Sequence, residues 1–253
     1  MERDDECMLD FRKRGVVAGI RVKSASEAEM LQSMWNALEA EEGFQTGAYS
    51  TTHSRHLDCR FVWELVSSPT ILDHVEKLIG PDILLFGSRF FCKYGPDAKY
   101  RVSWHQDIDS WGLEPPVAVT VWYAVDRSDM QNGCMQVIPG SHRTAALREH
   151  ETSPDEGNIL GRRQHLDIGT GELMLAQPIV LDAGEISIHD GALIHASMPN
   201  TSDRRRCGLA IRYVPCHVRQ RPELAKSPPS KAILVRGTDK YKNFGASCRP
   251  FAQ

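Results

Sequence analysis

The sequence contains no long hydrophobic run. Its longest largely apolar stretch, residues 117–125, has about nine residues, whereas a membrane-spanning helix needs roughly 18. The first residues are acidic and lack the pattern of a secretory signal peptide. These absences argue against a membrane or secreted protein, and we expect a cytoplasmic protein with no membrane partner.

Cysteine pairs and a strong net charge are also missing. The seven cysteines are odd in number, scattered and without a C-x-x-C pair, which argues against a disulfide framework or a zinc site and favours reduced thiols. The formal net charge is −3 and the basic residues are dispersed, so nothing indicates a nucleic-acid partner. No feature of the sequence indicates an oligomeric state.

The 253 residues are expected to form a single α+β, mainly β domain. Helical periodicity predicts helices over residues 24–42 and 69–78, and residues 1–80 are expected to be a helical N-terminal flank. From residue 81 onward, short β-rich runs separated by turns predict a jelly-roll core that extends to residue 253. The predicted strands are residues 83–86, 90–93, 117–125, 135–138, 178–181, 185–189 and 207–214. Residues 143–172 form an insert loop too long for a hairpin, and residues 219–231 are a second loop or lid candidate.

His105, Asp107 and His195 are the most informative residues of the chain. His105 and Asp107 lie two residues apart, so on a strand both side chains would project from the same face. His195 follows a turn and a strand, as closure of a jelly roll requires, and is the best candidate for a third ligand. Two imidazoles and one carboxylate form the ligand set of a non-haem iron(II) site that leaves three positions open.

Arg206 adds a candidate anchor for a carboxylate. It begins an apolar, alternating stretch eleven positions after His195, so its side chain can point into the barrel. A buried guanidinium binds a planar carboxylate through two hydrogen bonds and keeps its charge. Arg204, by contrast, is expected in a solvated turn.

Four motifs occur in order along the chain: residues 102–107 (V-S-W-H-Q-D), 132–142 (N-G-C-M-Q-V-I-P-G-S-H), 195–200 (H-A-S-M-P-N) and 205–213 (R-R-C-G-L-A-I-R-Y). In this order and spacing, the chain resembles the phytanoyl-CoA dioxygenase family of iron(II)- and 2-oxoglutarate-dependent oxygenases, from roughly residue 60 to the C-terminus. The resemblance implies a cupin-like double-stranded β-helix with flanking N-terminal helices.

The resemblance also implies the roles of the site residues. His105, Asp107 and His195 would bind Fe(II), and Arg206 would bind the distal carboxylate of 2-oxoglutarate. Ser197 matches a position that often supports this cosubstrate. Trp122 and Thr120 lie on the strand expected to line the same pocket.

The reaction implied is hydroxylation of an unactivated C–H bond of a small molecule with O2, releasing succinate and CO2. Related halogenases have a small residue in place of the ligand carboxylate, so Asp107 favours hydroxylation over halogenation. Desaturation, rearrangement and ring formation stay open, because the same oxidant can perform them.

The substrate is not indicated by the sequence. Trp111 could cover the site or stack on a cationic substrate group, and a similar tryptophan occurs in the ectoine hydroxylase branch of the family. Lys93 and Gln136 are further candidates for polar contacts. The substrate classes expected are a small zwitterion, an aminophosphonate-like compound or a natural-product intermediate. The absence of a basic patch argues weakly against a CoA thioester.

Two other functions stay open at this point. A cupin-like metalloenzyme that does not use 2-oxoglutarate would have no use for Arg206. A non-catalytic binding protein on the same fold would not need a complete metal site, whereas this sequence keeps all three ligands and the arginine.

Overall fold

A seven-stranded antiparallel sheet forms the frame of the molecule. The computed structural model describes residues 2–43, 48–144, 147–226, 231–245 and 248–251. Within these residues, six strands follow one another in the sheet, and β2 (Tyr49–His53) pairs with β3 beside them. The six are, in order, β1 (Val16–Arg21), β11 (Glu185–Asp190), β6 (Val119–Ala124), β13 (Arg206–Pro215), β3 (Ile83–Lys93) and β15 (Ile233–Arg236).

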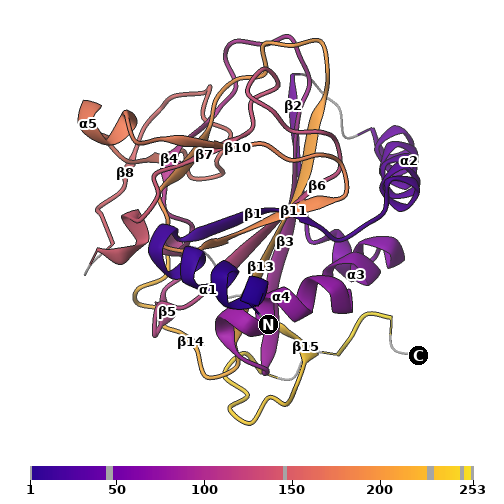
Figure 1. Cartoon of the computed structure of the whole chain (residues 1–253), viewed down its shortest axis with the longest axis vertical. Helices are drawn as coiled ribbons and strands as arrows, with labels where there is room; N and C mark the ends of the chain where they lie inside the picture. The colour runs from indigo at the N-terminus through magenta and orange to yellow at the C-terminus, as the bar shows by residue number, and fades with distance from the viewer. Residues whose placement is uncertain (1, 44–47, 145–146, 227–230, 246–247, 252–253) are drawn as a thin grey trace.

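A second, four-stranded antiparallel sheet lies against the large one. Its order is β10 (Gln177–Ile179), β7 (Met135–Val137), β12 (His195–Ser197) and β4 (Val102–His105). In Figure 1, β4, β7 and β10 lie on one side of the large sheet, and α2 (Ala25–Glu42), α3 (Arg60–Val66) and α4 (Pro69–Ile79) lie on the other. The arrangement confirms the expected β-rich jelly roll with flanking N-terminal helices.

Alternation along β13 separates the core from the interior of the roll. Cys207, Leu209, Ile211 and Tyr213 pack in one apolar cluster with residues of α2, α3 and α4. Trp35 of α2 stacks on Phe90 of β3 at 3.8 Å between ring centroids. The intervening residues of β13, which include Arg206 and Arg212, face the smaller sheet and line a cavity. Because successive side chains of a strand point to opposite faces, one strand builds both the core and the cavity wall.

Short elements complete the described chain. They are α1 (Glu2–Arg14), α5 (Thr170–Leu173), the 3₁₀ turns η1 (Arg55–Leu57), η2 (Asp107–Ser110) and η3 (Ser141–Arg143), and the paired strands β5 (Leu113–Glu114) with β14 (Arg219–Gln220) and β8 (Glu151–Thr152) with β9 (Gln164–His165). No helix in the described ranges combines the length and the apolar character needed to cross a membrane.

Both predicted helices are confirmed. Ser24 caps α2 in a reciprocal pair with Glu27, and Gly43 ends the helix in the left-handed region at φ 65°. Pro69 begins α4, and Gly80 follows its last turn.

Other elements differ from the prediction. The two strands predicted over residues 83–86 and 90–93 form one continuous strand, β3. Residues 1–80 are not only helical, because β1 and β2 join the large sheet. The insert at residues 143–172 has little regular structure beyond β8 and β9 where it is described. The lid candidate is tied down by β14, while residues 227–230 lie outside the described residues.

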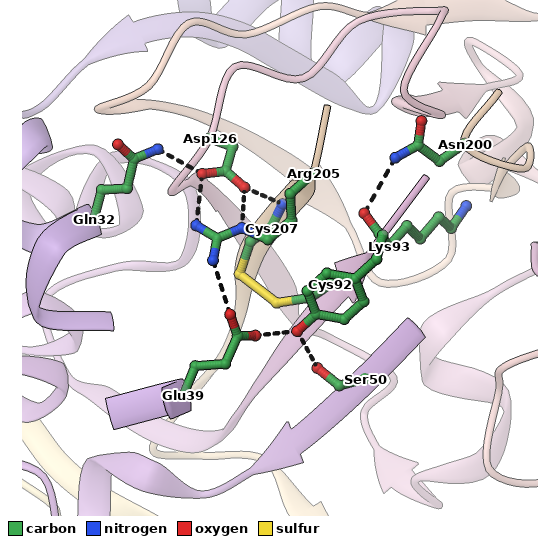
Figure 2. The surroundings of a disulfide bond; sticks show 10 residues. Gln32, Glu39, Ser50, Cys92, Lys93, Asp126, Asn200, Arg205 and Cys207 are labelled. Carbon is green, nitrogen blue, oxygen red and sulfur yellow. Dashed lines mark hydrogen bonds and ion pairs between the residues drawn. A yellow bond between two sulfur atoms is a disulfide. The ribbon is translucent and has the colours of Figure 1, made fainter. Parts of the chain in front are cut away.

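The expectation of reduced cysteines is wrong for one pair. Cys92 of β3 and Cys207 of β13 are direct cross-strand partners, are fully buried and form a disulfide (Figure 2). They are 115 residues apart in sequence and become neighbours only through strand register, which no local spacing reveals. Cys59, Cys134, Cys216 and Cys248 are free thiols.

Two buried tyrosines on the core face provide a test of the packing. The Tyr213 hydroxyl donates a 2.6 Å hydrogen bond to the Val66 carbonyl at the end of α3, whereas the buried Tyr123 hydroxyl has no partner among the described residues. We expect Tyr213→Phe to lower the free energy of unfolding by about 1–2 kcal/mol, because it leaves a buried carbonyl unpaired. Tyr123→Phe, the matched control, should change it little. Urea unfolding monitored by circular dichroism measures both; equal losses would contradict the assignment.

Candidate metal centre

Two histidines meet where β4 and β12 pair. His105 and His195 are direct cross-strand partners, their ring centroids lie 4.1 Å apart, and both side chains are buried. The long separation in sequence is therefore closed by a single antiparallel pairing in the smaller sheet.

Asp107 completes the cluster from a turn rather than from a strand. β4 ends at His105, and Asp107 begins the 3₁₀ turn η2. Gln106 between them keeps an extended backbone (φ −115°, ψ 127°), so the two ligand side chains still lie on the same side. One ligand atom from each of His105, Asp107 and His195 lies within 4.8 Å of the other two.

Backbone carbonyls orient both imidazoles. His105 Nδ1 lies 2.8 Å from the Ser103 carbonyl oxygen, and His195 Nδ1 lies 2.9 Å from the Leu193 carbonyl oxygen. A carbonyl only accepts, so each Nδ1 must carry the proton and each Nε2 keeps its lone pair. Metal-binding histidines are held in this way, and the donor set therefore fits a divalent metal ion.

Protonation states within the cluster also suit a metal. Burial, and then the charges of His105 and His189, hold the pKa of His195 well below its ordinary value, so that the ring is neutral. Burial acts to raise the pKa of Asp107, but its contacts with His105 and His189 outweigh burial and hold that pKa well below its usual range. A neutral imidazole and an ionised carboxylate are the forms that bind a metal.

Thr120 supports Asp107. Its hydroxyl donates a 2.8 Å hydrogen bond to Asp107 Oδ2 from the neighbouring strand β6. Thr120 was expected to line the cosubstrate pocket; the structure places it in the cavity wall, with its hydroxyl engaged by the carboxylate.

His189 was missed in the sequence. It is an inward residue of β11, with its Nε2 3.6 Å from Asp107 Oδ2 and its ring centroid 4.6 Å from that of His195. Neither ring nitrogen has a hydrogen-bond partner among the described residues. The only signal was its alternation with apolar Ile186 and Ile188, which is too common to single out a histidine.

Arg206 lies in the same cavity, at the first position of β13. The residue is 2% exposed, its guanidinium lies over the Trp122 ring at 5.1 Å, and it donates a 3.5 Å hydrogen bond to the Ser197 hydroxyl. Burial lowers the pKa of Arg206 to about 10, so the group stays charged at neutral pH. It forms no ion pair with a described carboxylate, and its Nε is buried without a partner.

Lys93 does not line the cavity as a substrate contact. It pairs with Arg206 in register, and its ammonium donates to the Ser197 hydroxyl (2.7 Å) and carbonyl (3.0 Å) and to the Met198 carbonyl. Figure 2 shows its side chain pointing away from the disulfide at the preceding residue. Lys93 therefore holds the chain that follows His195.

Trp111 and Gln136 also lie outside the described lining of the cavity. Trp111 is buried beside Phe86, and the cation over its ring, at 5.4 Å, is the protein's own Arg212. Gln136 alternates with the cavity residue Met135 on β7 and so faces away from the cavity.

The cavity is small, with about 60 Å³ of space that a water-sized sphere can occupy. It is lined by Phe91, Val102, His105, Asp107, Thr120, Trp122, Met135, Leu160, His189, His195, Ala196, Ser197, Arg206, Ala210 and Arg212. Leu160 belongs to the insert at residues 143–172. The insert is held near the metal cluster by His150, whose Nε2 accepts a 2.9 Å hydrogen bond from the backbone N–H of Gln106. About half of the lining residues are apolar, and the polar ones comprise the His-Asp-His cluster with its neighbours and the two arginines of β13.

Comparison with known proteins matches the chain to a family of dioxygenases. The family model described as phytanoyl-CoA dioxygenase (PhyH) matches residues 15–208. The dioxygenase lolE1 of Epichloe uncinata is 28% identical over 196 residues, which cover 71% of this chain and 70% of that protein. A probable alpha-ketoglutarate-dependent hypophosphite dioxygenase of Stutzerimonas stutzeri is 29% identical over 182 residues, which cover 69% of this chain and 60% of that protein.

Solved structures agree with these matches. ThoJ, a non-heme monooxygenase in its apo form, superposes with a TM-score of 0.76 at 29% identity, over 96% of this chain and 88% of that one. CytC3 with Fe(II) and alpha-ketoglutarate superposes with a TM-score of 0.67 at 25% identity, over 94% of this chain and 90% of that one.

Gly208 controls the position of Trp122. A Cβ at Gly208 would lie 2.2 Å from the Trp122 ring, whereas a Cβ at Gly87, on the neighbouring strand, would meet nothing within 4 Å. We expect Gly208→Ala to displace the Trp122 ring from Arg206 and to destabilise the protein by about 1–3 kcal/mol through overpacking. Gly87→Ala is the matched control. Crystal structures and urea unfolding of both variants test this, and an unmoved Trp122 in Gly208→Ala would refute it.

Proposed function

The chain belongs to the phytanoyl-CoA dioxygenase family, and on that premise we propose that it is an iron(II)- and 2-oxoglutarate-dependent dioxygenase that hydroxylates a C–H bond of a small molecule. One observation carries the proposal. A single cavity contains both a His-Asp-His cluster and, apart from it, a buried arginine that no described carboxylate neutralises. Fold alone would not support this reaction, because one fold hosts many functions.

The cluster would hold the iron. His105, Asp107 and His195 would each supply one ligand atom, with both imidazoles fixed by backbone carbonyls and Asp107 fixed by Thr120. When bound, iron together with 2-oxoglutarate and O2 supplies the oxidising chemistry that converts C–H to C–OH and releases succinate and CO2.

Arg206 would hold the distal carboxylate of 2-oxoglutarate. Its guanidinium can offer two parallel hydrogen bonds, and burial under Trp122 strengthens them by excluding water. Ser197 would donate its hydroxyl to the same carboxylate, because Lys93 already donates to that oxygen and orients it. Lys93 is thus a positioning residue for Ser197.

The substrate is a small molecule in this proposal. The small cavity suits a compact ligand, and its apolar residues Phe91, Leu160 and Met135 would keep water from the reacting carbon. The Stutzerimonas relative is named for hypophosphite, also a small substrate. The alternatives without 2-oxoglutarate find no support, since each would leave Arg206 buried without a counter-charge.

An anaerobic titration tests the proposal. Metal-free protein receives iron(II) and then 2-oxoglutarate, and we expect a visible charge-transfer band only when both are present. His195→Ala should lose iron binding, because two ligands remain. Arg206→Ala should keep iron but bind 2-oxoglutarate at least roughly 30-fold more weakly, the usual cost of removing one partner of a buried charge pair.

Arg204→Ala serves as the matched control. Arg204 lies two positions before Arg206, is partly exposed and pairs with Asp129, so its loss should leave both binding steps unchanged. Iron binding without a band in the wild-type protein would point to a metalloenzyme that does not use 2-oxoglutarate. Equal 2-oxoglutarate binding by wild-type and Arg206→Ala protein would reject the role of Arg206.

A further inference from the structure

A second arginine lies on the cavity face of β13. Arg206, Gly208, Ala210 and Arg212 occupy alternate positions and face the same way, and both arginines line the cavity. Arg206 stands beside Lys93 and Ser197. Arg212 stands beside Thr120, the residue that bonds Asp107, so the two arginines belong to different ends of the cavity wall.

Arg89 joins Arg212 at that end. Arg89 lies on β3 and pairs with Ala210 of β13. It is two residues from Gly87, which pairs with Arg212. It is 8% exposed, and its guanidinium lies over the Phe91 ring at 4.5 Å, while that of Arg212 lies over the Trp111 ring at 5.4 Å. Aromatic rings thus fix both cations in place.

Neither arginine has a counter-ion. Among the residues that the structure describes, no carboxylate forms an ion pair with Arg89 or Arg212, and the Nε of each is buried without a hydrogen-bond partner. Burial, and then the charge of Arg212, lower the pKa of Arg89 to about 10, so it is still protonated at neutral pH. Asp107 attracts both cations only at longer range.

The chain pairs its other partly buried arginines. Arg205, which immediately precedes β13, binds Asp126 through two nitrogens and Glu39 through a third (Figure 2). Leaving a buried charge unpaired is costly. Arg89 is buried, and its neighbour Arg212 is half-buried and lines the cavity. Because neither is paired, they indicate an anion that is supplied from outside.

The proposed cofactors do not supply this anion. Iron and the side chains of Arg206 and Lys93 carry four positive charges, whereas Asp107 and the two carboxylates of 2-oxoglutarate supply three negative charges. Arg89 and Arg212 then still carry two uncompensated positive charges beside the metal cluster. A cationic substrate would be repelled there, and Trp111 is already covered by Arg212.

We propose that Arg89 and Arg212 bind an oxyanion group of the substrate, a carboxylate or a phosphonate, and so hold a small organic anion with its reacting C–H bond toward the metal cluster. This inference rests on the proposed function and specifies its substrate class. The planar, paired donors of two guanidiniums suit such groups.

Calorimetry on the loaded protein tests the inference without turnover. Protein saturated with manganese(II) and 2-oxoglutarate is titrated with propionate, methylphosphonate and the neutral propionamide. We expect at least one of the two oxyanions to bind and the amide not to bind; the oxyanion that binds more tightly identifies the group. Arg212→Met and Arg89→Met should each weaken oxyanion binding at least roughly 10-fold.

Arg204→Met, remote from the cavity wall, is the control and should bind as the wild type does. Retention of manganese and 2-oxoglutarate binding by the Arg89 and Arg212 variants shows that they are folded. The wild-type comparison of anion with amide stands even where a variant does not fold. Equal binding of propionamide, no oxyanion binding by the loaded wild type, or unchanged affinity in both variants overturns the inference.

The two proposals fail in different ways. Wild-type protein that does not take up manganese and 2-oxoglutarate contradicts the proposed function. Protein that takes up both but binds no oxyanion contradicts only the inference. Loss of 2-oxoglutarate binding in Arg212→Met, with retention in Arg206→Met, would show that the ends of the cavity have been assigned the wrong way round.

Discussion

The pairing of β13 between β3 and β6 is the constraint on which the rest of the structure depends. Its outward residues, such as Leu209 and Ile211, complete the apolar core under the helices, and its inward residues carry the charges of the cavity. A slip of one residue would bury Arg206 in that core and expose Leu209 to the cavity. Such a slip would destabilise the packing on both faces of the strand at once. The register is therefore more strongly specified than by the packing of one face alone.

In this molecule, polar side chains that support the fold have partners within the protein, whereas those expected to bind ligands lack them. Arg205 and Arg206 are neighbours in sequence, yet Arg205 is fully engaged by Asp126 and Glu39, whereas Arg206 meets no described carboxylate. The two ring nitrogens of His105 and of His195 also differ in this way. In each histidine Nδ1 is bonded to a backbone carbonyl, whereas Nε2 is left available to the metal cluster. A protein interior normally pairs its polar groups, so groups left unpaired in one cavity point to what that cavity accommodates.

Local patterns predicted the parts of this site that depend on local geometry. The spacing of His105 and Asp107 depends only on the extended backbone of Gln106 between them, the alternation after Arg206 depends on one strand, and the caps of α2 depend on one helix. The contacts that the sequence did not reveal are between strands. Lys93 meets Ser197, and Cys92 meets Cys207, only because distant segments pair in one register. Trp111 lies near the ligand motif in the sequence and was therefore predicted to contact the substrate. In the fold, the group over its ring is Arg212, which comes from a distant part of the chain.

The strand that carries both cavity arginines, β13, also fixes the distance between them. Arg206 and Arg212 are six positions apart on β13, which at about 3.3 Å per residue places their Cα atoms roughly 20 Å apart along one rigid element. Only every second position faces the cavity, so an arginine can be moved along this wall only in steps of roughly 7 Å. With the two ends assigned as proposed, relatives that take longer or shorter substrates would differ by such whole steps, and intermediate lengths would have to be met by the flexible arginine side chains or by the opposite sheet.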